Sequence, residues 1–100
     1  MNWLEFTQIV NTEDLEFENE ILVYPNPTNG RIYLDGDLKK NQYVEIRVYN
    51  VIGQLVFKKN IEDVEVLNEE LNLSELENGN YFIKIQLEDG EHITNKILKH

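Results

Sequence analysis

Cysteine is absent from this chain of 100 residues, so disulfides, thiolate nucleophiles, cysteine zinc sites and iron–sulfur ligation are excluded. Positive charge is scarce, because nine Lys and Arg stand against nineteen Asp and Glu, a formal net charge of −10. That balance argues against nucleic acid or an anionic membrane surface as a partner, since both need a basic footprint. No apolar run approaches the ~20 residues of a membrane helix, and the start lacks signal-peptide features. We therefore expect no membrane insertion. If the protein is exported, we expect this chain to be part of a longer protein.

Groups that could carry catalysis are few. The chain has one serine, Ser74, and two histidines, His92 and His100. Ser74 opens a Ser-Glu-Leu-Glu sequence that fits a capping box over a single helical turn, so a structural role is favoured over a catalytic one. Asp35-Gly36-Asp37 begins like a calcium loop but continues with Leu38-Lys39, which puts a cation where an oxygen ligand belongs. We expect no enzymatic activity, no metal and no cofactor.

The chain is rich in apolar residues that recur with a period of two, which is typical of strands with one buried and one wet face. The pattern is clearest over 43–49 and 81–87, with weaker runs at 21–24, 31–34, 54–58, 64–67, 70–73 and 92–98. Turn-forming residues separate these runs, including Asp35-Gly36-Asp37, Gly53 and Asp89-Gly90. Asp89-Gly90 predicts a hairpin over 81–98. Together the runs predict an all-β fold, an antiparallel sandwich or barrel with almost no helix.

Residues 1–20 differ from the remainder, so we expect a linker or a remnant of an upstream region there and a folded domain over 21–100. The stretch 11–20 is rich in acidic side chains, has no basic one, and offers Leu15 and Phe17 as its large apolar anchors. Residues 3–10 are compatible with a further strand or with the end of an upstream domain.

Four aromatic side chains are predicted to point outward from the strands: Tyr33, Tyr43, Tyr49 and Phe82. Such residues stabilise a sheet by cross-strand pairing, and they can also stack on sugar rings. A carbohydrate-binding or adhesion module therefore stays open as an alternative function, as does a structural spacer domain.

Four blocks of sequence, taken together, resemble a known family. They are Val23 to Leu34 (VYPNPTNGRIYL), Val48 to Val56 (VYNVIGQLV), Leu73 to Ile85 (LSELENGNYFIKI) and Thr94 to His100 (TNKILKH). In this order and with these spacings they resemble the C-terminal sorting domain of type IX secretion cargo in Bacteroidetes-type bacteria. The resemblance covers about residues 21–100.

The resemblance implies an Ig-like antiparallel β-sandwich of about seven strands that acts as a secretion signal. An outer-membrane translocon would recognise the domain after its cargo reaches the periplasm, and a sortase-like peptidase would then remove it. The cargo, attached upstream in the same chain, would end at the cell surface or be secreted. We expect cleavage within 11–20, where few contacts protect the backbone, and a monomer in preference to an oligomer.

The resemblance also singles out individual residues. The family motif falls on Pro25, Asn26, Pro27, Gly30, Gly53, Leu76, Gly79 and Tyr81. Leu76, Gly79 and Tyr81 resemble a tyrosine corner, in which a phenol reaches back to an upstream backbone group. The candidates for recognition by the translocon are Lys96, Ile97, Leu98 and Lys99, although strand lysines are also commonly just solvated.

Overall fold

The computed structural model describes residues 20–100, which form five β-strands and no helix. The strands are β2 (Glu20–Tyr24), β3 (Arg31–Asn50), β4 (Leu55–Asn72), β5 (Gly79–Leu87) and β6 (His92–Lys99). They form one antiparallel sheet in the order β2-β3-β5-β6, and β4 also pairs with β3. The predicted all-β, antiparallel class is therefore confirmed. Within the described part of the chain, no helix is long and apolar enough to span a membrane.

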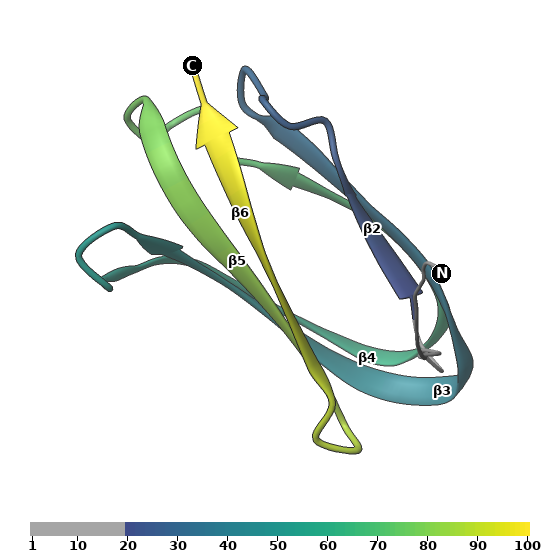
Figure 1. Cartoon of the computed structure of the whole chain (residues 1–100). Coiled ribbons are helices and arrows are strands. Elements are labelled where there is room, and N and C mark those ends of the chain that lie inside the picture. The colour runs from purple at the N-terminus through teal and green to yellow at the C-terminus, as the bar shows by residue number, and fades with distance from the viewer. Residues whose placement is uncertain (1–19) are drawn as a thin grey trace, which may run out of the picture.

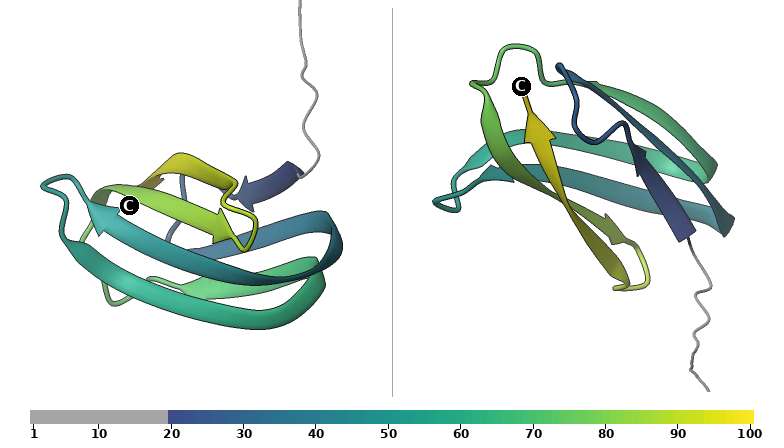
Figure 2. Two further views of the ribbon diagram at one scale, coloured as in Figure 1. Left: turned by 90° about the horizontal axis from the view of Figure 1, so that it is seen from below. Right: turned by 45° about the horizontal axis from the view of Figure 1, so that its top comes forward.

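β3 organises the sheet, because its two halves have different neighbours. Its residues 33–37 pair with β2 and its residues 44–50 pair with β5, while β4 pairs along both halves. Between the halves the pairing shifts in register, and Lys39 on β3 and Asp63 on β4 adopt positive φ angles of 73° and 60°. Figures 1 and 2 show the result: the β3–β4 hairpin curves, so that β2 and the first half of β3 lie across from β5 and β6.

The curved sheet buries one core between its two halves. Buried side chains fall on alternate positions along β3, β5 and β6, as a half-buried strand requires. The first half contributes Ile21, Ile32 and Leu34, and the second half contributes Ile46, Ile83 and Ile97, all in one cluster. Each fully buried side chain of this size stabilises the fold by roughly 1.5–3 kcal/mol. The strands predicted over 43–49 and 81–87 and the hairpin over 81–98 are confirmed by this pattern and by the β5–β6 pairing.

The predicted number of strands is not confirmed, since about seven were expected and the described residues form five. Asp35-Gly36-Asp37, read as a turn, lies inside β3, where Gly36 pairs with Ile21 of β2 and Leu67 of β4. Because strands on both sides pair with this backbone, the chain stays extended past the glycine. In the same way, nearly all of the separate runs expected over 54–73 lie in the continuous strand β4.

Residues 1–19 lie outside the described residues, so the expected linker and the possible strand over 3–10 are not assessed by the structure.

Candidate recognition surface

The side chain of Asn26 joins two segments that are far apart in the sequence. Its Nδ2 donates to the backbone oxygen of Lys96 at 2.9 Å, and its Oδ1 accepts from the backbone nitrogen of Leu98 at 3.0 Å. The amide group therefore pairs with β6 as a neighbouring strand would. Pro25 and Pro27 flank it in the loop that follows β2, and both Tyr24–Pro25 and Asn26–Pro27 are cis peptides.

Thr28 continues this contact with the end of β6. Its backbone nitrogen donates to the oxygen of Leu98 and its backbone oxygen accepts from the nitrogen of His100, both at 2.9 Å. Its hydroxyl donates to the backbone oxygen of Arg31 at 2.6 Å and accepts from the nitrogen of Gly30 at 3.0 Å. Thr28 is 1% exposed. The role of Thr28 was not predicted from the sequence. The one feature that could have indicated it is the position of Thr28 directly after the Pro-Asn-Pro motif.

The connection between β4 and β5 meets the same end of the sheet. Leu73 donates its backbone N–H to the oxygen of Gly30 at 2.7 Å. The hydroxyl of Tyr81 donates to the backbone oxygen of Glu77 at 2.5 Å, so the predicted tyrosine corner is confirmed. Gly79 has a φ of 149°, in the region that favours glycine, and pairs with Lys99.

The capping box predicted at Ser74 is wrong. The Ser74 hydroxyl donates to Oδ1 of Asn72 at 2.6 Å, and its backbone nitrogen donates to the same oxygen at 3.1 Å. The segment forms a turn closed by the N–H of Leu76 on the oxygen of Leu73 at 3.0 Å. The local hydrogen bonds to Asn72 thus accompany a turn in place of the expected helical turn.

Gly53 lies in the turn between β3 and β4, which is built around Asn50. The Asn50 side-chain oxygen accepts from the backbone nitrogens of Ile52 at 3.1 Å and Gln54 at 2.9 Å. Gly53 has a φ of 87° and donates its N–H to the backbone oxygen of Asn50 at 3.0 Å. This turn and the residues around Gly79 line one shallow hollow of about 240 Å³.

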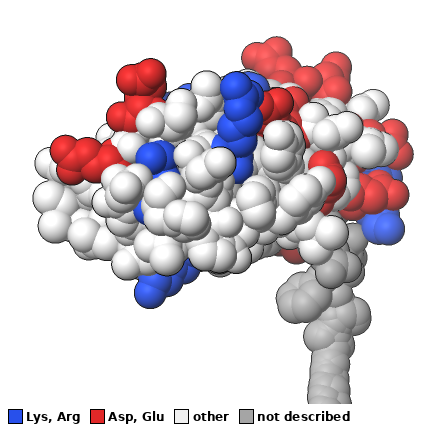
Figure 3. Space-filling view, turned by 90° about the horizontal axis from the view of Figure 1, so that it is seen from above, with Lys and Arg blue, Asp and Glu red and all other residues white. Residues whose placement is uncertain are grey.

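All the predicted motif residues therefore lie at one end of the molecule, which we call the motif end and define as residues 25–30, 50–54, 73–81 and 96–100. The exposed apolar side chains here include Ile52, Val51 and Leu98, which are 74%, 66% and 40% exposed. Figure 3 looks down on the end where the chain terminates in Figure 1 and shows mostly uncharged surface, with charged groups mainly towards its margin. Exposed apolar side chains therefore lie among the motif residues at this end.

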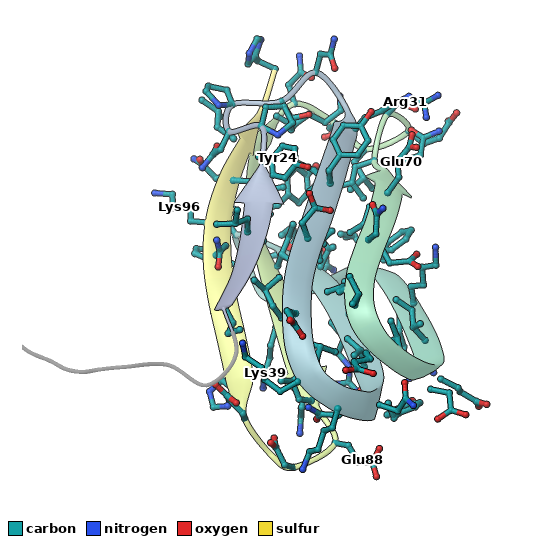
Figure 4. All side chains as sticks on the ribbon, turned by 90° about the vertical axis from the view of Figure 1, so that its right-hand side faces the viewer. Tyr24, Arg31, Lys39, Glu70, Glu88 and Lys96 are labelled. Carbon is teal, nitrogen blue, oxygen red and sulfur yellow. The ribbon has the colours of Figure 1, made fainter. Side chains whose placement is uncertain are left out.

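The four recognition candidates divide into two pairs. Lys96 and Leu98 point outward and are exposed, whereas Ile97 is 1% and Lys99 is 7% exposed. The Nζ of Lys99 donates to Oδ1 of Asn78 at 3.1 Å, which ties the end of β6 to the tyrosine corner. Figure 4 shows Lys96 projecting away from the sheet. A partner can contact Lys96 and Leu98 directly, while Ile97 and Lys99 position the strand.

The predicted outward aromatic residues occupy two different faces. Tyr43, Tyr49 and Phe82 lie on the outer side of the half formed by β3 and β5, and Tyr33 lies on the other half, stacked on Tyr24 with ring centroids 5.7 Å apart. The Tyr24 hydroxyl donates to Asp35, and this hydrogen bond raises the pKa of the phenol. Arg31 and Glu70 form an ion pair on this same face (Figure 4).

Replacing Asn26 by alanine should lower the free energy of unfolding by about 1–3 kcal/mol, since two hydrogen bonds of about 0.5–1.5 kcal/mol each are lost. Hydrogen exchange at the Leu98 amide should accelerate by about tenfold, because each 1.4 kcal/mol is a factor of ten. Denaturant unfolding and amide exchange measure the two effects. Asn29→Ala is the matched control, because Asn29 is exposed and no side-chain hydrogen bond involves it within residues 20–100. Equal effects of both substitutions would contradict the role of Asn26.

The described residues thus define an antiparallel β domain whose motif residues gather at one end. Within residues 20–100, no three His, Cys, Asp or Glu side chains are grouped so as to hold a metal ion. Residues 22–100 match the family described as the secretion system C-terminal sorting domain, and the chain belongs to that family. These residues are accordingly a C-terminal secretion signal of the type IX system.

The chain is also similar to part of a characterised protein. The chain is 29% identical over 79 residues to Beta-agarase D of Zobellia galactanivorans, and the aligned region is 79% of this chain. The same region makes up 15% of that protein, so the chain spans a small part of its relative.

Proposed function

We propose that the type IX translocon recognises this domain through the motif end, and that the domain directs an upstream cargo to the cell surface or the medium. The observation that carries the proposal is the family match over residues 22–100. The small share of Beta-agarase D that aligns also supports it, because a sorting signal is a short part of a larger cargo protein. On this proposal the domain performs no reaction of its own.

The structure favours the motif end as the contact surface for two reasons. The family motif residues gather there, and Asn26 and Thr28 hold the terminal strand in place by backbone hydrogen bonds. Lys96 and Leu98 project from that strand, so a cation and an apolar group stand at fixed positions beside the loop. A partner would therefore meet a preorganised surface, which lowers the entropic cost of binding.

The order of events follows from the proposed role. The cargo would cross into the periplasm first, and the folded domain would then engage the translocon at the outer membrane. A sortase-like peptidase would cut within residues 11–20, which end at the first residue of β2. The domain is the substrate of that peptidase, and the cargo in the same chain is the product that reaches the surface.

The test is to fuse the full chain behind a periplasm-targeted fluorescent protein, in a host with the type IX translocon and in its translocon-null derivative. Fluorescence should reach the surface or the medium in the intact host alone. Leu98→Asp should lower export by about tenfold, which corresponds to about 1.4 kcal/mol of lost contact energy. Mass spectrometry of the released protein should place its new end within residues 11–20.

Thr94→Asp is the matched control, because Thr94 is exposed on the same strand but lies outside the motif end. It should be exported like the unmodified chain. Folded fusion trapped in the periplasm of both hosts would contradict the proposed function. Equal loss of export for Thr94→Asp and Leu98→Asp would contradict the motif end as the contact surface.

A further inference from the structure

The outer face of the half formed by β4, β3, β5 and β6 is a regular grid of side chains, which we call the four-stranded face. Residues directly opposite each other on neighbouring strands share one row of this grid. The row beside the motif end consists of Leu55, Tyr49, Phe82 and Lys96, and the next row consists of Lys58, Arg47, Lys84 and Thr94. Buried residues alternate with these positions along β3, β5 and β6, so the grid faces away from the core.

The four-stranded face carries several cations side by side. Arg47 lies directly opposite Lys58 on one side and Lys84 on the other, and we call these three residues the cationic row. Lys96 adds a fourth cation, so the face holds four of the nine basic residues of a chain whose formal net charge is −10. Like charges directly opposite each other destabilise a sheet, so the stability of the fold does not account for this arrangement.

The positive charge of this face is only partly neutralised. Glu45 is the one acidic residue within 44–50, 55–61, 81–87 and 92–99. Its Oε2 lies 2.9 Å from Nη2 of Arg47 and 3.3 Å from Nζ of Lys58. The hydrogen bond to Arg47 lowers the pKa of the Glu45 carboxyl, so this group is ionised at neutral pH. Lys84 and Lys96 form no ion pair with any acidic side chain of residues 20–100, and the face keeps an excess of positive charge.

Apolar side chains lie directly beside the cationic row. Tyr49 is opposite Leu55 of β4 and Phe82 of β5, and we call these three residues the apolar row. Leu55 is 49% exposed and Phe82 is 36% exposed. Nη1 of Arg47 donates to the hydroxyl of Tyr49 at 3.4 Å, so the two rows are in contact. A ligand that covers both rows needs negative charge and apolar surface next to each other.

Anionic polysaccharides combine these two features. Neighbouring strands lie about 4.8 Å apart, so a polymer that crosses the strands meets one cation per strand, a spacing similar to that of successive sugar units. Carboxylate or sulfate groups on the sugars would pair with the cationic row, and the C–H faces of the rings would pack on the apolar row. Asn60 and Gln86, both exposed and both opposite Glu45, offer amide groups to the sugar hydroxyls.

Two other kinds of anionic partner fit this face less well. Peptides are commonly bound along a free strand edge or in a groove, whereas the backbones of β3 and β5 are paired on both sides here. Nucleic acid has a denser charge, one per about 1.7 Å in a double helix, and a chain with a net charge of −10 repels it strongly.

We propose that the four-stranded face binds anionic polysaccharide, with the acidic groups of the sugars on the cationic row and the sugar rings on the apolar row. The inference rests on the charge and the apolar groups of this face. It goes beyond the role in secretion and does not depend on the translocon.

Titration of the isotope-labelled full chain with dextran sulfate, and with dextran as the uncharged form of the same polymer, tests this proposal. The salt concentration is ~0.15 M, where charges more than about 8 Å apart are largely screened. Dextran sulfate should cause saturable shifts of the amide signals of Arg47, Lys84 and Phe82, whereas dextran should cause none. Lys58→Gln combined with Lys84→Gln should weaken the binding by about tenfold, which corresponds to about 1.4 kcal/mol.

The apolar row is tested by Phe82→Ala, which should weaken the binding of dextran sulfate by about fivefold, or about 1 kcal/mol. Poly-L-glutamate has carboxylates but no sugar rings, so it should bind more weakly than dextran sulfate. Its affinity should be unchanged by Phe82→Ala. An equal effect of this substitution on both polymers would contradict the packing of sugar rings on the apolar row.

The matched control for the lost charges is Lys39→Gln combined with Lys40→Gln, two exposed residues in the bend of β3. The control for the lost ring is Tyr24→Ala, because Tyr24 is 43% exposed on the other half of the sheet. Both should bind dextran sulfate like the unmodified chain. A control weakened as much as its counterpart, or no saturable binding, would overturn the proposal. So would tighter binding of poly-L-glutamate or of an oligothymidylate, which would assign the face to an acidic protein or to nucleic acid.

Discussion

Replacing Ile97 by alanine should lower the free energy of unfolding by about 2–5 kcal/mol, the usual cost of removing a large aliphatic group from a core. Ile97 is 1% exposed and belongs to the cluster that joins both halves of the sheet. The melting temperature should fall by at least about 8 °C, because 1 kcal/mol shifts a domain of this size by about 4–8 °C. Thermal and urea unfolding measure the change.

Leu98→Ala provides the comparison on the same strand. Leu98 is 40% exposed, and a surface substitution of this kind should change the stability by less than about 1 kcal/mol. Similar losses for both variants would mean that Ile97 does not carry core packing. The pair also guides secretion assays: loss of export in Ile97→Ala reports a damaged fold, whereas loss of export in the still-stable Leu98→Ala reports a lost contact.

Replacing Gly30 by alanine should destabilise the domain by about 2–4 kcal/mol, since backbone strain and a steric clash act together. Gly30 has a φ of 143°, and a Cβ built there would lie 3.1 Å from both Cα and Cβ of Ser74. Ser74 is held in place by Asn72, so it has little freedom to move away. Denaturant unfolding gives the value directly.

Gly53→Ala measures the cost of backbone strain without a steric clash. Gly53 has a φ of 87°, and nothing lies within 4 Å of the added Cβ. Its cost should be about 1–2 kcal/mol, the penalty for an ordinary residue in a left-handed conformation. A Gly53 variant as unstable as the Gly30 variant would show that contact with Ser74 contributes nothing.

The sequence predicted the strands where local pattern and tertiary packing agree. Residues 43–49 and 81–87 alternate strictly, and both lie in strands whose apolar side chains reach the core. The turn prediction at Gly36 failed because its neighbours β2 and β4 come from distant parts of the sequence, and their pairing overrides the local preference of Asp-Gly-Asp. The separate runs predicted over 54–73 likewise lie almost entirely in one strand, β4, and the described residues form five strands where the resemblance implies about seven.

The candidate site was predicted as a set of residues but not as a surface. Asn26 and Lys96 were named for separate reasons, and their contact links positions 70 residues apart, for which no local pattern exists. The inward orientation of Lys99 was not predicted either, because its partner Asn78 lies in the connection between β4 and β5. Tyr81 was predicted well, because a tyrosine corner is formed with a residue four positions upstream.

The contacts of Asn26 and Thr28 with β6 also mean that the motif end can fold only after β6 has been synthesised. β6 follows the other described strands in the sequence, yet the loop after the first described strand has its partners there. A chain that stops before residue 96 would leave the edge of β5 largely unpaired, and such an edge invites pairing with other chains. A copy without β6 could not assemble the motif end, so the surface that we propose for recognition would form only in chains that include β6.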